Sequence, residues 1–281
     1  MRKLTISAIS FVNTAPLMWD FTHGNAASGF EFSCAVPAKC AEALQAGTAD
    51  IAIIPAATYA TIPGLLILPD IAIAAKGPVR SILLVSHKQL SDIRTVATDT
   101  SSRTTVALAR LLFRKHWGGD REFYPADPDL DTMLQRADAA LIIGDPALKV
   151  DRSKYHTWDL SEEWMKLTGK PFVFAFWAVR LQSISELQPG LDLGDVFRRS
   201  MLNGTRPDSI AGIAREWSPR LGLSEPDITW YLTRSIHYHL DPECISGLEL
   251  FFRLLEEEGF IPHAPELRFL GALTLLAKVR H

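Results

Sequence analysis

The first half of the chain alternates short strand patterns with short helix patterns. Leu4–Ile9 alternates apolar and polar residues, which indicates a strand. Asp50–Pro55 is a nearly unbroken apolar run, as expected for a strand covered on both faces. A helix that ends at Gly47 is expected just before it, because glycine commonly terminates helices. The first series therefore comprises strands at Leu4–Ile9, Phe30–Val36 and Asp50–Pro55 and helices at Leu17–Phe21 and Lys39–Gln45.

A second series of the same kind follows the apolar strand expected at Ser81–Ser86. Phe172–Val179 is the last strong strand pattern, and residues after Leu187 have helical patterns with prolines at the turns. Strands that alternate with helices predict an α/β protein. The second series comprises strands at Thr95–Thr98, Glu122–Tyr124 and Ala139–Ile143 and helices at Thr104–Trp117 and Leu130–Arg136.

Two such series followed by helices predict a two-lobed protein whose first lobe is discontinuous. Residues 1–85 plus 180–281 are expected to form lobe one, and residues 86–179 are expected to form lobe two. The apolar strands at Ser81–Ser86 and Phe172–Val179 are expected to cross between the lobes as a hinge. Proteins of this shape close around a ligand in the cleft, so a site is expected there.

Composition removes several classes of function. The 281 residues are 47% hydrophobic and carry a net charge of −3, so no basic excess indicates a nucleic-acid partner. No apolar run approaches the ~18 residues that a membrane span needs. Three cysteines without a CxxC pair argue against a disulfide framework and a zinc ribbon. Polar residues interrupt the N-terminal apolar stretch, so no export signal is expected and a cytoplasmic location is predicted. The oligomeric state stays open.

Histidines offer no obvious metal site. His237 and His239 are two residues apart, which suits one face of a strand, whereas Trp230–Leu240 has a helical pattern. A metal pair is therefore not expected there. Neither an HExxH nor a GxSxG motif occurs in the chain.

Four polar segments follow predicted strands, where ligands of α/β proteins collect. In the first, Ser10–Pro16, Asn13 can donate and accept hydrogen bonds, and Thr14 can cap the following helix. The second contains Arg80, which could pair with a carboxylate, and Ser81, at the start of a crossing strand. A plain capping turn and a surface arginine are the alternatives to ligand binding.

The third segment, between Thr98 and Thr105, is the most informative. Several hydroxyls and backbone N–H groups converge there on the start of a long helix, which suits a carboxylate or a phosphate. It lacks the glycines and the GK[ST] ending of a Walker loop, and a simple cap needs only one hydroxyl. The candidate anion-binding residues are Thr100, Ser101, Ser102, Arg103 and Thr104.

The fourth segment follows the buried strand that ends at Ile143. Gly144 permits close approach of the backbone, and Asp145 stands at the carboxyl end of the strand. Three roles are open for Asp145: a general base, a partner for a substrate hydroxyl, or only the cap of a short helix.

Five motifs stand in order along the chain: SFVNTAP (Ser10–Pro16), GPVRSILL (Gly77–Leu84), DTSSRTTVAL (Asp99–Leu108), LIIGDPAL (Leu141–Leu148) and DLSEEWMKLTGKPFVFAFWAVR (Asp159–Arg180). Together they resemble the chorismate dehydratases of the futalosine route to menaquinone, the MqnA family. The resemblance runs in order from Lys3 to about Arg180 and continues more loosely through the C-terminal helices. Several long motifs in the right order are far more specific than any one of them.

The resemblance implies a type II periplasmic-binding-protein-like fold adapted to catalysis in the cytoplasm. It also implies the loss of water from chorismate to give 3-[(1-carboxyvinyl)oxy]benzoate, without a metal or organic cofactor. A sister family, the 1,4-dihydroxy-6-naphthoate synthases, shares the fold and relies on a histidine in its second lobe. Asp145 stands in the IGDPAL segment of this chain, where no histidine occurs, which favours the dehydratase.

Chorismate is a dianion, so the hydroxyl-rich helix start and the Asn13/Ser81 pair could hold its two ends. The proton acceptor is either Asp145 or the substrate's own enolpyruvyl carboxylate. We favour the substrate carboxylate, with Asp145 as an orienting group, because no residue in the motifs looks tuned as a base. The alternatives to a dehydratase are a non-catalytic solute-binding protein of the same fold and the naphthoate synthase.

Overall fold

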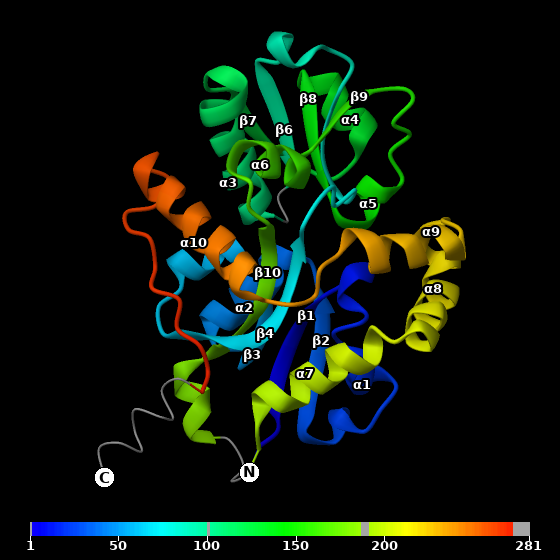
Figure 1. Ribbon diagram of the computed structural model, residues 1–281, viewed down its shortest axis with the longest axis vertical. Helices are drawn as coiled ribbons and strands as arrows, with labels where there is room; N and C mark the ends of the chain where they lie inside the picture. The colour runs from blue at the N-terminus through cyan, green and yellow to red at the C-terminus, as the bar shows by residue number, and fades with distance from the viewer. Residues whose placement is uncertain (1, 100–101, 187–190, 272–281) are drawn as a thin grey trace.

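The computed structural model describes residues 2–99, 102–186 and 191–271. Two five-stranded sheets, each flanked by helices, build two lobes that lie end to end (Figure 1). The α/β class and the two-lobed fold are therefore as the sequence predicts. No helix in the described ranges has the length and apolar character that a membrane crossing requires.

The first sheet, in the lower lobe of Figure 1, is mixed. Its central strand pairs in parallel with one neighbour and antiparallel with the other. The strand order is β2 (Phe30–Ala35), β1 (Leu4–Ile9), β3 (Ile51–Pro55), β10 (Phe172–Arg180) and β4 (Leu65–Ala75).

The second sheet has the same plan. The first three of its strands pair in parallel, the fourth pairs antiparallel with the third, and the fifth pairs antiparallel with the fourth. The order is β7 (Glu122–Ala126), β6 (Thr95–Asp99), β8 (Ala139–Ile143), β5 (Ile82–Ser86) and β9 (His156–Asp159).

Helices cover both sheets, and several of them begin or end at capping residues. Helix α2 ends at Gly47, whose φ of 77° is the left-handed value that glycine adopts without strain. Asp159 and Asp192 accept backbone N–H groups at the starts of α6 and α7. The α-helices are α1 (Trp19–Thr22), α2 (Pro37–Ala46), α3 (Arg103–Leu112), α4 (Leu130–Arg136), α5 (Gly144–Leu148), α6 (Leu160–Thr168), α7 (Leu193–Gly204), α8 (Pro207–Leu221), α9 (Glu225–Trp230) and α10 (Pro242–Glu257).

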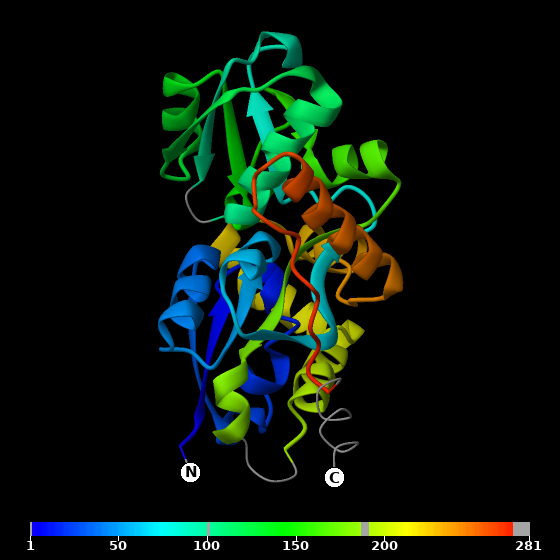
Figure 2. The ribbon, with the colours of Figure 1, turned by 90° about the vertical axis from the view of Figure 1, so that its left-hand side faces the viewer.

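The C-terminal helices return to the first lobe. Phe197 of α7 packs its ring against Phe21 and Trp177, each with ring centroids 4.9 Å apart, so α7 shares the core of the first sheet. Figure 2 shows the segment after α10 running back along this lobe, where the N–H of Ile67 donates to the carbonyl of Arg268 at 2.7 Å.

The two strands expected to cross between the lobes each lie within one sheet. Strand β5 pairs only with β8 and β9, and β10 pairs only with β3 and β4, as far as the described residues show. The chain passes between sheets at residues 76–81 and 169–171 instead. The boundaries between the lobes therefore lie before residues 85 and 180, the positions at which the sequence predicted them. The prediction placed them too late because an apolar run does not reveal which sheet it joins.

The structure contains two strands that the sequence patterns did not predict, β4 and β9. It also ends the helical segment after Trp230 earlier than expected. Residues 236–240 are not helical, since the carbonyls of His237 and Tyr238 accept the N–H groups of Ala74 and Ala72 from β4. The predicted helical pattern over Trp230–Leu240 is wrong in its second half.

Candidate active site

A cavity between the two sheets is lined by both lobes and by the segment that joins them. Its polar lining side chains are Asn13, Ser81, Ser102 and Thr105, and the rest of its lining is mainly apolar. Such a cavity suits a small molecule with an apolar body and polar ends. The apolar side chains include Ile9, Phe11, Ile73, Val79, Ile143 and Phe174.

One polar end of the cavity is built around a buried tyrosine, Tyr231. It lies in a π-helical turn, η7 (Tyr231–Ser235), that continues α9, and it is 2% exposed. The Nδ2 of Asn13 donates to the Tyr231 hydroxyl oxygen at 3.1 Å, and that hydroxyl donates to Oγ of Ser81 at 2.8 Å. Three segments far apart in the sequence thus meet at one hydrogen-bonded chain.

Ser81 is placed there by a carboxylate beneath the joining segment. Asp159, which is 4% exposed, accepts the N–H of Val79 at 3.1 Å and the N–H of Arg80 at 2.6 Å. The same carboxylate accepts the N–H groups of Ser161 and Glu162 at the start of α6. Asp159 therefore ties the joining segment to the second lobe just before Ser81.

The other polar end is the start of α3. Ser102 caps this helix, because its Oγ accepts the N–H of Thr105 at 3.2 Å, and it also donates to Oγ1 of Thr105 at 2.7 Å. Both residues are buried and line the cavity. The free N–H groups and partial positive charge of a helix start favour an anion at this end.

Gly144 and Asp145 connect the lobes beside the cavity. The φ of Gly144 is 63°, and a Cβ there would lie 2.5 Å from the ring of Phe11, so only glycine fits. Oδ1 of Asp145 accepts the N–H of Val12 at 3.1 Å. Val12 begins the 3-10 turn η1 (Val12–Thr14), which carries Asn13. Asp145 thus holds the segment that presents Asn13.

The environment of Asp145 disfavours its charge. Burial raises the pKa of Asp145 to about 6, and the Val12 hydrogen bond and the Lys149 charge offset only part of this effect. A carboxylate with this pKa is mostly ionised at neutral pH and could accept a proton.

Comparison with known proteins shows the family. A family model described as menaquinone biosynthesis matches residues 4–257. The chain belongs to this menaquinone-biosynthesis family. A curated relative, the chorismate dehydratase of Thermus thermophilus, is 28% identical over 283 residues, which cover 94% of this chain and 98% of the relative.

Solved structures agree on the fold. A protein of Archaeoglobus fulgidus superimposes with a TM-score of 0.69 at 17% identity, covering 92% of this chain and 98% of its own. The alkanesulfonate-binding protein SsuA of Xanthomonas axonopodis pv. citri, bound to MOPS, gives 0.67 at 15% identity, covering 96% of each chain. The chain therefore has the periplasmic-binding-protein-like fold that the sequence predicts.

Several of the residues predicted for the site come together. Asn13, Ser81, Ser102 and Gly144 line one cavity, although they come from four separate polar segments. Asp145 lies next to them, because it follows Gly144 in the chain and accepts the N–H of Val12. Contact of these residues with a ligand stays a prediction. Thr100 and Ser101 lie outside the described residues.

Other predicted residues have different surroundings. The Arg80 guanidinium lies 4.8 Å from the centre of the Trp230 ring and borders a separate hollow, and Arg103 borders an outer groove beside α3. Oγ1 of Thr104 accepts the N–H of Ala57 at 3.0 Å. Thr14 is buried, and its Oγ1 donates to Oδ1 of Asn13 at 3.5 Å. Arg80 and Thr104 therefore have protein neighbours of their own, and neither they nor Arg103 line the cavity.

The sequence patterns did not single out Tyr231, Phe11 or Phe174 as site residues. Tyr231 stands in an amphipathic helical run, where an aromatic residue usually belongs to the core. The one available signal is that a buried tyrosine hydroxyl needs a partner, and the sequence does not say which.

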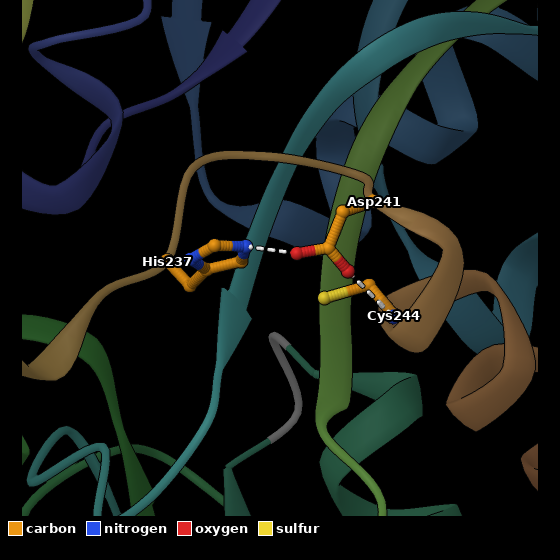
Figure 3. A group of neighbouring side chains, drawn as sticks. All are labelled: His237, Asp241 and Cys244. Carbon is orange, nitrogen blue, oxygen red and sulfur yellow. Dashed lines mark hydrogen bonds and ion pairs between the residues drawn. The ribbon is translucent and has the colours of Figure 1, made fainter.

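A second cluster of polar side chains lies outside the cavity, at the start of α10 (Figure 3). Nε2 of His237 lies 2.8 Å from Oδ2 of Asp241, and one ligand atom each of His237, Asp241 and Cys244 lie within 4.8 Å of one another. However, Nζ of Lys76 already pairs with Oδ2 of Asp241 at 2.7 Å, and burial raises the pKa of the Cys244 thiol to about 12. The cluster serves as a charge-neutralised helix cap, with Asp241 accepting the N–H of Cys244.

Proposed function

We propose that this chain is a chorismate dehydratase, a carbon–oxygen lyase that converts chorismate to 3-[(1-carboxyvinyl)oxy]benzoate and water in menaquinone biosynthesis. The observation that carries the proposal is a mainly apolar cavity lined by two groups of polar residues, Asn13 and Ser81 on one hand and, at the start of α3, Ser102 and Thr105 on the other. Chorismate has an apolar ring region and two carboxylates, which match this arrangement. The activity of the curated relative supports the same reaction.

The reaction requires little from the protein beyond orientation. The ring proton beside the ether oxygen leaves, its C–H electron pair forms a ring double bond, and the neighbouring hydroxyl departs as water after gaining a proton. The ring carboxylate acidifies the proton through the conjugated system, and the product is aromatic. Fixing both carboxylates and excluding bulk water is therefore the main task of the cavity.

The enolpyruvyl carboxylate of the substrate is our proposed proton acceptor. Asp145 has an orienting role in this scheme, because its carboxylate already accepts the Val12 N–H and thereby holds the turn that carries Asn13. Donors at Asn13 and Ser81 would keep the substrate carboxylate within reach of the ring proton. We also propose that the lobes close over the substrate and that the protein is located in the cytoplasm.

A non-catalytic solute-binding role is the second candidate, because proteins that bind small anions share the fold. Purified protein mixed with chorismate separates the two. The dehydratase produces an aromatic product that is followed by ultraviolet absorbance and proton NMR, whereas a binding protein leaves chorismate intact. The naphthoate synthase alternative predicts turnover of cyclic dehypoxanthinyl futalosine instead. No conversion of chorismate at high enzyme concentration would overturn the proposal.

A further inference from the structure

Resting on the proposed function for the identity of the ligand, we infer that Tyr231 is a positioning residue that makes one end of the cavity selective for a carboxylate. It does so by fixing the direction of two hydrogen bonds behind the cavity wall. Tyr231 itself does not line the cavity, whereas its two partners, Asn13 and Ser81, do.

The chemistry of the three groups fixes the direction of both bonds. An amide NH₂ can only donate, so Nδ2 of Asn13 donates to the Tyr231 oxygen. The Tyr231 hydrogen is then directed to the remaining neighbour, Oγ of Ser81. Burial raises the pKa of the Tyr231 hydroxyl above its ordinary value, so the hydroxyl keeps its hydrogen.

Each partner is left with a hydrogen to donate. The Ser81 oxygen accepts from Tyr231, so its own hydrogen points elsewhere, and none of the described side chains or carbonyls accepts it. The second Nδ2 hydrogen of Asn13 is likewise unused within the described chain, while Oδ1 faces Thr14. Both residues line the cavity, so the Tyr231 chain turns them into two donors aimed at a ligand.

Two donors aimed at one ligand group discriminate by charge. Hydrogen bonds to an ionised oxygen are about twice as strong as those between neutral groups. A ligand hydroxyl that needs an acceptor gains less at this end. Without the Tyr231 hydroxyl, Ser81 and Asn13 can turn toward each other, and the cavity then loses the donors that a carboxylate needs.

The position of Tyr231 is held from outside the cavity. The ring centre of its neighbour Trp230 lies 4.8 Å from the guanidinium of Arg80, the residue before Ser81. The tyrosine and the serine are therefore anchored to each other twice, once through this cation–π contact and once through their hydroxyls. This anchoring gives Arg80 a supporting role in place of the predicted ligand contact.

The test compares Tyr231→Phe with Tyr238→Phe. Both remove one buried tyrosine hydroxyl, but that of Tyr238 has no hydrogen-bond partner among the described residues. Tyr231→Phe is expected to raise KM for chorismate about tenfold or more, with kcat changed less than about threefold. Tyr238→Phe is expected to leave both constants unchanged. Equal KM values in wild type and Tyr231→Phe would overturn the inference, and so would a loss confined to kcat.

Two further measurements separate positioning from a merely structural effect. Calorimetry with 3-[(1-carboxyvinyl)oxy]benzoate and its dimethyl ester measures the preference for the carboxylates, which Tyr231→Phe is expected to reduce about tenfold. Ser81→Ala removes the acceptor, so the double variant is expected to have no higher KM than the worse single variant. Additive effects, or an unchanged acid-to-ester ratio, would contradict the inference.

Failure of the wild-type protein to convert chorismate would overturn the proposed function alone, since the calorimetric preference still tests Tyr231. Failure of the wild-type protein to bind the acid would overturn both the proposed function and the inference.

Discussion

The ionised carboxylate of Asp145 lowers the free energy of unfolding of the protein. Its folded-state pKa of about 6 lies above the ordinary value of about 3.9. Between these values the folded state binds more protons than the unfolded state, so the free energy of unfolding falls as pH rises from about 4 to about 6. The ionised carboxylate therefore lowers stability at neutral pH, a loss that is tolerated if the carboxylate has a use in the site.

The variant Asp145→Asn tests what that use is. Asparagine keeps an oxygen for the Val12 N–H but does not ionise, so the variant is expected to gain up to about 3 kcal/mol over wild type between pH 4 and pH 7. Urea unfolding at several pH values measures this difference. If Asp145 orients the site, activity stays within about tenfold of wild type, whereas a loss of a hundredfold or more identifies it as the base.

Ser102 caps α3 and lines the cavity, so its predicted role in binding can be tested against the cost of losing a helix cap. Ser102→Leu removes the cap of α3, at about 1 kcal/mol, and fills part of the cavity. The variant is expected to fold and to lose measurable binding of chorismate. Asp192→Ala is the matched control. It removes the cap of α7, where Oδ1 of Asp192 accepts the N–H of Asp195 at 3.0 Å. An unchanged KM in Ser102→Leu would remove the start of α3 from the site.

At the scale of elements, Asp159 joins β9, α6 and the segment that leads to β5. Asp159→Ala leaves four N–H groups without their acceptor, in buried or partly buried surroundings, and is expected to destabilise the protein by about 3 kcal/mol or more. Asp129→Ala, which removes an exposed cap of α4, is expected to cost only about 1 kcal/mol. Guanidinium unfolding of both variants measures the contrast, and equal losses would show that Asp159 is an ordinary cap.

Elements with a simple local pattern could be predicted from the sequence, and those set by distant partners could not. Helix α2 follows from its apolar spacing and Gly47, and Asn13, Ser81 and Ser102 stood out as polar residues at strand ends. Strand β4 contains Pro69 and Asp70, and the φ of Asp70, 67°, breaks the strand pattern. The helix after Trp230 ends because β4 offers partners to residues 237 and 238, which no local pattern reveals.

The same reason explains what was missed in the site. Tyr231 lies 218 residues from Asn13 and 150 from Ser81 in the chain, so its role depends on the packing of α9 beneath the joining segment. The lobe boundaries have a similar origin, because β10 is apolar along nearly its whole length and would fit either sheet. Motif resemblance supplied the ordered set of segments, but it did not supply the contacts among them.

At the scale of the whole molecule, a few polar contacts beside the cavity hold the lobes against each other. The Val12 N–H donates to Asp145, and the Ala57 N–H donates to Thr104, each across the gap between lobes. Phe11 of the first lobe packs directly on Gly144 of the second. These contacts would have to break if the lobes moved apart about the joining segments at 76–81 and 169–171.

Closure over the ligand can be tested at Gly144. Product is expected to reduce the radius of gyration of the wild-type protein in small-angle X-ray scattering, because the ligand contacts both lobes. Gly144→Ala places a Cβ 2.5 Å from the Phe11 ring and is expected to prevent the full compaction and to weaken product binding roughly tenfold or more. Gly222→Ala, at the end of α8, is the matched control, since Gly222 has a similar φ of 67° but nothing within 4 Å of its Cβ position. It carries the same backbone strain without the contact between lobes, so it should compact as wild type does. Scattering curves that are identical with and without saturating product in the wild type would contradict closure, and equal behaviour of the two glycine variants would show that strain, and not the Phe11 contact, controls it.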